Sequence, residues 1–380
     1  MKNISRILVI FSLLLSSGCI TEFVPKTTED QDMLVVEGLI TDKPDVYTIK
    51  LSKPFHLGLS NTAHPITGCN VSVSDNTGQT YSFTETAQGT YVSDSAKFQG
   101  IIGRTYTLHI SSNTNSVLNY ESFPVLLKAV PPIDSVYYEK IVLGKDVDGK
   151  STEEGCRIYL NTHDPKNECK FYRWEYSETW EFRLPYSTPN NTCWLSSNSD
   201  EINIKNTSVI AEAKVEKLLL TTISNETDRL RERYSILVKQ YSLNEDEYLY
   251  WEKLENISEQ VGGLYDIIPS SIPSNIYCLD DPTQKVLGYF SVSSSSTKRI
   301  FINDKFKGIR TPYTNNACIS DTIFGSPNSP IAWLGIYTWV IVAHTVPPPS
   351  YRVLTRTEGC YDCTVRGTNI MPAFWAAGKK

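Results

Sequence analysis

Cys360 and Cys363 are separated by two residues, a spacing that can hold zinc, carry out thiol exchange or take part in structural disulfides. Zinc would need further ligands, and the sequence has no second C-x-x-C and no paired histidine motif. Thiol exchange would need a βαβ context, which the pattern does not indicate. Structural disulfides in an oxidising compartment are therefore favoured, with metal and redox roles as alternatives. Apart from Cys19, the candidates for up to four disulfides are Cys69, Cys156, Cys169, Cys193, Cys278, Cys318, Cys360 and Cys363.

Cys19 directly follows an export-type signal. Residues 1–6 carry two positive charges, residues 7–15 are apolar, and Ser16 to Gly18 are small. The segment ending at Cys19 is similar to a lipobox, although Ser16 stands where an aliphatic residue is usual. We therefore expect residues 1–18 to be a lipoprotein signal peptide, Cys19 to be lipidated and residues 19–31 to form a tether. The alternative is an ordinary secretory signal with a chance cysteine at the cut.

The sequence shows no motif of a common enzyme class. It has no G-x-S-x-G elbow, no P-loop and no G-x-G-x-x-G that opens a helix. His109 alternates with apolar residues and is expected to face solvent, and His163 lies beside Pro165 in an expected turn. The five scattered histidines are His56, His64, His109, His163 and His344. We predict no catalytic residues, no metal site and no cofactor.

Three carboxylate clusters need an explanation. Glycoside cleavage requires two carboxylates about 5–10 Å apart, which linear sequence does not reveal. Glu245 to Glu247 open a predicted helix, where negative charge is favourable at the positive end of the helix dipole. Asp280 and Asp281 precede a proline and predict a turn, with calcium binding as the alternative. The third cluster is Glu153–Glu154.

Short alternating strands dominate the first part of the chain. Tyr106, Leu108 and Ile110, for example, fall on one face of a predicted strand, and an Asn-Thr-Gly turn separates two others near residue 78. No helical stretch lies between them. The pattern predicts a β-sandwich domain over residues 32–130, immunoglobulin-like or prealbumin-like, that ends at Pro131 and Pro132.

The remaining residues, 131–380, predict a larger β-rich domain with one or two helices. Tyr172 to Phe182 reads as a wide aromatic strand pair, and most of its rings are expected in the core, with an exposed binding patch as the alternative. One helix is predicted over residues 245–261, with Ser242 as its cap and Tyr250, Leu254, Ile257 and Val261 on one face. A weaker helix is predicted over residues 209–220. The apolar residues 331–343 are too short to span a bilayer and suit one or two buried strands.

Composition excludes several classes of protein. An apolar share of 40% and a charged share of 21% suit a globular protein with a core. The formal net charge of -6 becomes -8 once the signal with its two basic residues is removed. Because no basic stripe is present, we expect no nucleic-acid binding.

Several stretches together resemble a known family: Leu34 to Asp42, Trp251 to Leu254, Val286 to Ser291, and Cys360 to Cys363 followed by Pro372 to Trp375. In this order, behind a lipoprotein signal, they are similar to the Bacteroidetes outer-membrane lipoproteins grouped as domain of unknown function 4249. The resemblance brings no catalytic residues. It implies a companion of a TonB-dependent transporter, an outer-membrane β-barrel that imports nutrients. Only Glu22 is acidic just after Cys19, so the surface and periplasmic leaflets both stay open.

We therefore expect a non-enzymatic, lipid-anchored outer-membrane protein that serves a β-barrel transporter as accessory subunit or ligand-binding companion. The alternatives are an envelope hydrolase that acts on glycans and an envelope assembly factor. A deep cleft with two carboxylates of raised pKa would favour the hydrolase, and a broad apolar surface patch would favour a protein-binding role.

Overall fold

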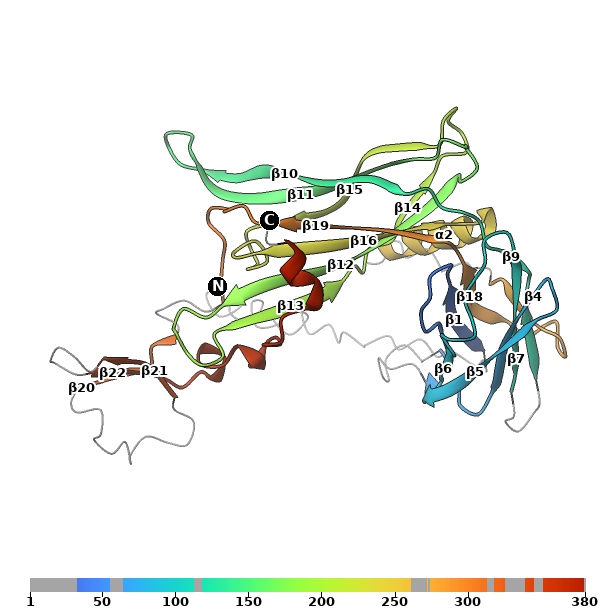
Figure 1. Cartoon of the computed structure of the whole chain (residues 1–380), viewed down its shortest axis with the longest axis horizontal. Coiled ribbons are helices and arrows are strands. Elements are labelled where there is room, and N and C mark those ends of the chain that lie inside the picture. Colours follow the sequence, from blue (N-terminus) through green and yellow to red (C-terminus); the bar gives the residue numbers. More distant parts are fainter. Residues whose placement is uncertain are drawn as a thin grey trace, which may run out of the picture.

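The computed structural model describes residues 33–54, 64–112, 118–260, 272, 274–312, 318–324, 339–344 and 351–378. Strands account for 52% of these described residues and helices for 9%, which confirms a mainly β fold made of several sheets. The strands form two large units, and a further small sheet lies toward the C-terminal end (Figure 1).

The first unit is a curled sheet around one hydrophobic core. Its pairing order is β17-β8-β7-β4-β5-β6-β2-β1-β18, with β3 added to β2 and β9 to β7. The bounds are β1 Leu34–Ile40, β2 Thr48–Lys53, β3 His64–Pro65, β4 Asn70–Asp75, β5 Thr80–Ala87, β6 Thr90–Ser93, β7 Thr105–Ser111, β8 Asn119–Ser122, β9 Val125–Leu126, β17 Ile276–Cys278 and β18 Val286–Val292. As predicted, Tyr106, Leu108 and Ile110 of β7 are all buried in this core.

The two ends of this pairing order are tied together. The Asn275 side chain, just before β17, donates to the Phe290 carbonyl of β18 and accepts from the Phe290 amide, each at 2.9 Å. Residues of both late strands belong to the same core as those of β1 and β2. The first unit therefore draws on two stretches of the chain, residues 34–127 and 275–292.

The second unit packs a three-stranded sheet against a five-stranded one. Their orders are β10-β11-β15 and β13-β12-β16-β19, with β14 also paired to β12. The bounds are β10 Ile133–Lys145, β11 Ser151–His163, β12 Phe171–Arg183, β13 Thr192–Asn198, β14 Asn203–Asn206, β15 Lys214–Ile223, β16 Tyr234–Ser242 and β19 Ser295–Ile302. Tyr172, Trp174 and Ile158 belong to the core that the two sheets share.

Two predictions for this unit are wrong. Residues 172–182 are part of one long strand, not a strand pair, because β12 continues without a turn from Tyr172, opposite Ser242, to Trp180, opposite Tyr234. The weak helix predicted over residues 209–220 overlaps β15, a strand of the three-stranded sheet. Pairing of β15 with β11, from Cys156 opposite Ile223 onward, overrides the local helical pattern.

The strong helix prediction is confirmed by α2, Glu245–Gln260, the one α-helix among the described residues. Its predicted cap is wrong. The Ser242 hydroxyl, at the end of β16, donates to the Lys128 carbonyl at 2.7 Å. The helix begins instead after Asn244, whose carbonyl accepts from the Tyr248 amide at 3.0 Å. α2 lies where the second unit meets the first (Figure 1).

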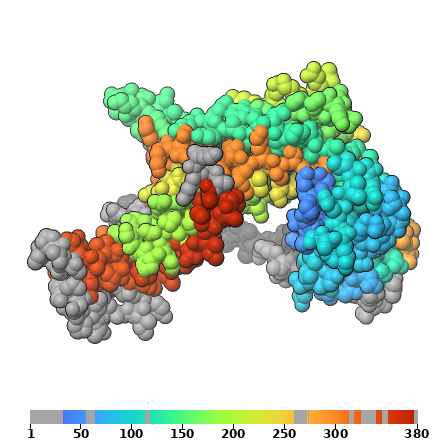
Figure 2. Space-filling view, in the orientation of Figure 1, coloured from blue at the N-terminus to red at the C-terminus, as the bar shows by residue number. Residues whose placement is uncertain are grey.

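The C-terminal part forms a small sheet, β20-β22-β21, and three short 3-10 helices. The bounds are β20 Asp321–Phe324, β21 Trp339–His344, β22 Tyr351–Thr355, η1 Glu358–Cys360, η2 Cys363–Val365 and η3 Ala373–Gly378. Of the apolar stretch 331–343, only residues 339–343 lie within the described residues, and they belong to β21. In Figure 2 the orange-red small sheet and the blue first unit lie toward opposite ends of the molecule.

Candidate functional site

A pocket of about 550 Å³ lies where the two units meet, and we call it the interunit pocket. Strands β1, β2 and β18 of the first unit form one wall, and β12 and α2 of the second unit form the other. Its lining residues are Val36, Glu37, Gly38, Leu39, Thr48, Lys50, Arg173, Glu175, Tyr250, Trp251, Leu254, Tyr289 and Ser291. The volume falls in the range of roughly 300–1,000 Å³ that is usual for small-molecule sites.

Arg173 is the most constrained charged group of the pocket, with 7% of its surface exposed. Its guanidinium lies 4.3 Å from the Trp251 ring centroid and 5.0 Å from that of Tyr241. Its Nη1 donates to Glu175 at 2.6 Å, and the Tyr241 hydroxyl donates to the other Glu175 oxygen at 3.1 Å. Arg173 is therefore held in place before any ligand arrives, although its Nε has no partner among the described residues.

Glu247 lies behind the pocket wall and is fully buried. The Trp251 indole is 3.5 Å from its Oε1, while its Oε2 has no partner in the described part of the chain. Burial raises the pKa of the Glu247 carboxyl to about 7, although a hydrogen bond with Ser291 and the charge of Arg173 oppose this effect. A carboxyl of this kind exchanges its proton near neutral pH.

The opposite wall carries two exposed side chains of opposite charge. Glu37 of β1 and Lys50 of β2 are direct cross-strand neighbours, and Tyr289 of β18 faces Glu37 from the other side. Neither Glu37 nor Lys50 makes an ion pair or side-chain hydrogen bond with a described residue. The hydroxyls of Tyr250 and Tyr289 likewise have no partner there, and their rings lie 4.8 Å apart. The pocket thus combines a fixed cation, free charges of both signs and aromatic surface.

A larger hollow of about 650 Å³ on the first unit differs from the interunit pocket in how its charged groups are paired. Its charged groups are already paired within the unit: Asp42 with Lys43 at 3.0 Å, Lys97 with Asp94 at 3.0 Å, and Arg104 with Asp75 at 2.6 Å. We therefore regard the interunit pocket as the better candidate.

The comparison of sequences decides the family. A family model described as a domain of unknown function (DUF4249) matches residues 20–299. The chain belongs to this family. The DUF4249 match covers every residue of the interunit pocket and ends before the small C-terminal sheet. A search of curated proteins finds no match.

The disulfides of this DUF4249 protein tie the segment beyond the matched range to the rest of the chain. Cys193, inside the range, pairs with Cys363, and Cys318 pairs with Cys360. The two cysteines of the C-x-x-C motif thus have different partners. Both bonds close long loops, with sequence separations of 170 and 42 residues.

The disulfide prediction is wrong for Cys69, Cys156, Cys169 and Cys278, which are free and buried. Cys69 precedes β4 and Cys278 ends β17, so β7 and β8 lie between them. At about 4.8 Å for each strand spacing, their distance is about 14 Å, whereas disulfides need Cα atoms within about 7 Å. Cys156 and Cys169 are also far apart. The Cys169 amide donates to the Asp164 side chain, so Cys169 lies close to Asp164. Asp164 follows Cys156 by eight residues, just beyond the end of β11, and the extended strand between them keeps the two cysteines apart.

The aromatic run of β12 does not form an exposed binding patch, because Tyr172, Trp174, Tyr176, Trp180 and Phe182 are all buried. The core interpretation is correct. The polar residues that alternate with them, Arg173 and Glu175, line the pocket instead. Alternation along β12 places Arg173 and Glu175 on the face opposite the aromatic rings. No local sequence pattern, however, indicates that α2 covers that face.

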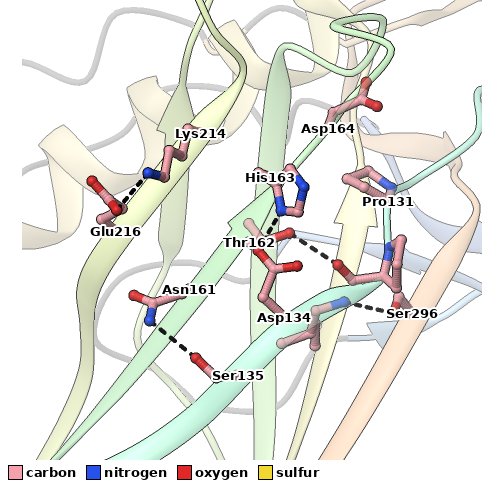
Figure 3. Close-up of polar contacts among 12 residues, drawn as sticks. Pro131, Asp134, Ser135, Asn161, Thr162, His163, Asp164, Lys214, Glu216 and Ser296 are labelled. Atoms are coloured by element: carbon pink, nitrogen blue, oxygen red, sulfur yellow. Dashed lines mark hydrogen bonds and ion pairs between the residues drawn. The ribbon is translucent and has the colours of Figure 1, made fainter.

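His163 is the histidine whose surroundings most resemble a catalytic pair. Its Nδ1 lies 2.7 Å from Asp134 Oδ2, beside a hollow of about 480 Å³ (Figure 3). The side chain is 51% exposed, and no hydroxyl or thiol of a described residue is hydrogen-bonded to the ring. Nearby Lys214 is paired with Glu216 at 2.6 Å. We interpret His163–Asp134 as a cross-strand contact between β11 and β10.

The other predicted residues have structural contacts. His64 lies in β3, His109 is 2.7 Å from the Ser74 hydroxyl, and the His344 ring stacks on Tyr351. His56 and Cys19 lie outside the described residues. Glu154 pairs with Lys307 at 3.7 Å, and Glu153 packs against Gly308. Asp280 accepts from the Asn119 amide at 2.6 Å, and Asp281 accepts from the Thr283 amide at 2.9 Å, as a turn requires.

Proposed function

We propose that this DUF4249 protein is a non-enzymatic, lipid-anchored protein of the outer membrane. In this proposal it binds a small ligand in the interunit pocket and acts as companion to a TonB-dependent β-barrel transporter. The observation that carries the ligand-binding part is the set of polar groups without partners in that pocket. Glu37 and Lys50 form no ion pair with a described residue, and the Arg173 guanidinium is held against two aromatic rings.

Glu37 and Lys50 are exposed at the pocket and remain available to a ligand, whereas burying them without partners in a packed interface would destabilise the fold. Four separate strands and α2 converge on this pocket, and the charged residues come from both units. A ligand that satisfies them would also join the two units more firmly. The arrangement suits binding better than bond cleavage, since Glu175 is already engaged by Arg173 and Tyr241.

The anchor and the transporter partner rest on the sequence. The lipobox-like segment before Cys19 supports a lipid tether, and membership of DUF4249 supports the family's envelope context. Two or more acyl chains on one cysteine would give a stable membrane attachment. Among the residues that the structure describes, no helix is both long and apolar enough to cross a membrane.

The decisive experiment is recovery of the full lipidated chain from its native membranes in mild detergent, followed by mass spectrometry. We expect a β-barrel transporter in near-stoichiometric amount. The matched control is Cys19→Ala. Without the lipid, this variant is not held in the membrane beside the barrel, so it should recover much less of the barrel. Recovery of the chain alone, at a yield that would reveal a partner, would contradict the companion role.

A further inference from the structure

We propose that the interunit pocket recognises a free α-amino acid or a short peptide end with an apolar or aromatic side chain. This inference rests on the proposed ligand-binding function and names the chemical class of the ligand. The geometry that points to it is an adjacent pair of opposite free charges beside an aromatic wall, with a fixed guanidinium across the pocket.

The head group of the ligand is determined by Glu37 and Lys50. Residues that face each other on neighbouring antiparallel strands have Cβ atoms about 5 Å apart. Their carboxylate and ammonium can therefore both reach the two charged groups of an amino acid, which are attached to one carbon atom. Each contact would be a hydrogen bond between opposite charges, the stronger kind in proteins.

The side chain of the ligand is determined by the apolar wall. Tyr250 and Leu254 of α2 and Tyr289 of β18 line the pocket, and Leu39 lies on the same strand as Glu37. Aromatic and aliphatic ligand groups are stabilised by such surfaces, because contact removes apolar area from water. The free tyrosine hydroxyls can in addition bond to a peptide group.

Arg173 extends the site beyond a single head group. Its guanidinium lies against two aromatic rings, and Glu175 occupies Nη1, so the side chain does not need to be reorganised on binding. A carbonyl or second carboxylate of a short peptide would supply an acceptor for its remaining N–H groups. A neutral sugar could use the aromatic wall, but it offers no charged group to Glu37 and Lys50. The charges therefore favour the amino-acid class.

Calorimetric titration of the full chain carrying Cys19→Ala tests this directly. The probes are L-phenylalanine, the dipeptide Ala-Phe, N-acetyl-L-phenylalaninamide, glucose and N-acetylglucosamine. We expect saturable binding of phenylalanine or Ala-Phe and at least tenfold weaker binding of the capped compound, which lacks both charges. Glu37→Gln and Lys50→Gln should each weaken binding of the charged probe at least tenfold.

Lys145→Gln is the matched control, because Lys145 is an exposed lysine at the end of β10 and makes no ion pair with a described residue. It should bind like the parent chain, and near-ultraviolet circular dichroism should show that all variants are folded. Equal binding of the capped and charged compounds would overturn the inference. Binding of a sugar in place of an amino acid would also overturn the inference, but it would leave the proposed ligand-binding function intact. If none of the probes binds, the inference fails, and recovery of the transporter then decides the proposed function separately.

Discussion

At the residue scale, Glu247 shows how much the surroundings change a carboxyl group. It belongs to the acidic first turn of α2, together with Glu245 and Asp246. At that place a solvated carboxylate would interact favourably with the helix dipole. Glu247 instead points into the protein and is fully buried, so desolvation raises its pKa to about 7. The ionised form is then the unfavourable one in the folded state.

The stability of the protein should therefore depend on the protonation of Glu247. As pH rises from 4.5 to about 7, the carboxyl of the unfolded chain loses its proton first, so the free energy of unfolding falls over this window. At about 1.36 kcal/mol for each pKa unit, the loss reaches about 3 kcal/mol. Glu247→Gln removes the charge and should be more stable than the parent at pH 8, with little difference at pH 4.5. Urea unfolding of both chains at the two pH values measures this. Equal destabilisation at both would show that the amide fits poorly and that charge is not the cause.

At the scale of elements, β18 joins a late stretch of the chain to the first unit. It pairs in parallel with β1, from Leu34 opposite Val286 to Ile40 opposite Val292, and contributes Phe290 and Val292 to the core. Gly288 lies in the middle of this strand at a φ of +85°, and a Cβ there would be 1.9 Å from the Val36 carbonyl oxygen. Only glycine allows the two backbones to approach so closely.

Gly288→Ala should therefore separate β18 from β1 and destabilise the protein by about 3 kcal/mol or more, since strain and overlap act together. The matched control is Gly149→Ala in the β10–β11 turn. That glycine also has a positive φ, of +75°, but no atom lies within 4 Å of the added carbon. Gly149→Ala should lower the free energy of unfolding by about 1 kcal/mol, which is the cost of the backbone strain alone. Thermal unfolding of both variants compares them, and similar losses would show that contact with Val36 is unimportant.

The cysteines give a second prediction at this scale. In the Cys19→Ala chain, denatured without reductant, four thiols should react with maleimide: those of Cys69, Cys156, Cys169 and Cys278. After reduction, Cys193, Cys363, Cys318 and Cys360 should react as well. Mass spectrometry counts the added groups and locates them by peptide. Labelling of both Cys360 and Cys363 before reduction would show that the C-terminal segment is not attached as described.

At the scale of the whole molecule, local sequence patterns predicted which residues form strands and helices better than they predicted which strands pair with each other. Alternation along β7 and β12 and the helical spacing in α2 were readable, because each is fixed within a few residues. The joining of β18 to β1 spans about 250 residues, and no local signal marks it. The interunit pocket depends on that joining, so the roles of Arg173 and Glu247 were hidden. The helix predicted over β15 failed for the same reason, since its partner strand decided its conformation.

At this scale we also predict that Cys19 holds the protein to a membrane. Cys19 directly follows the export-type signal, and the expected tether of residues 19–31 precedes the first described residue, 33. Cys19→Ala removes the thiol that would carry diacylglycerol, so the chain should move from the membrane fraction to the soluble fraction after cell lysis. Cys278→Ala is the matched control, because it removes a cysteine that is free and buried in the first unit. That variant should stay with the membranes. Retention of Cys19→Ala in carbonate-washed membranes would contradict the lipid anchor and point to attachment through a partner protein.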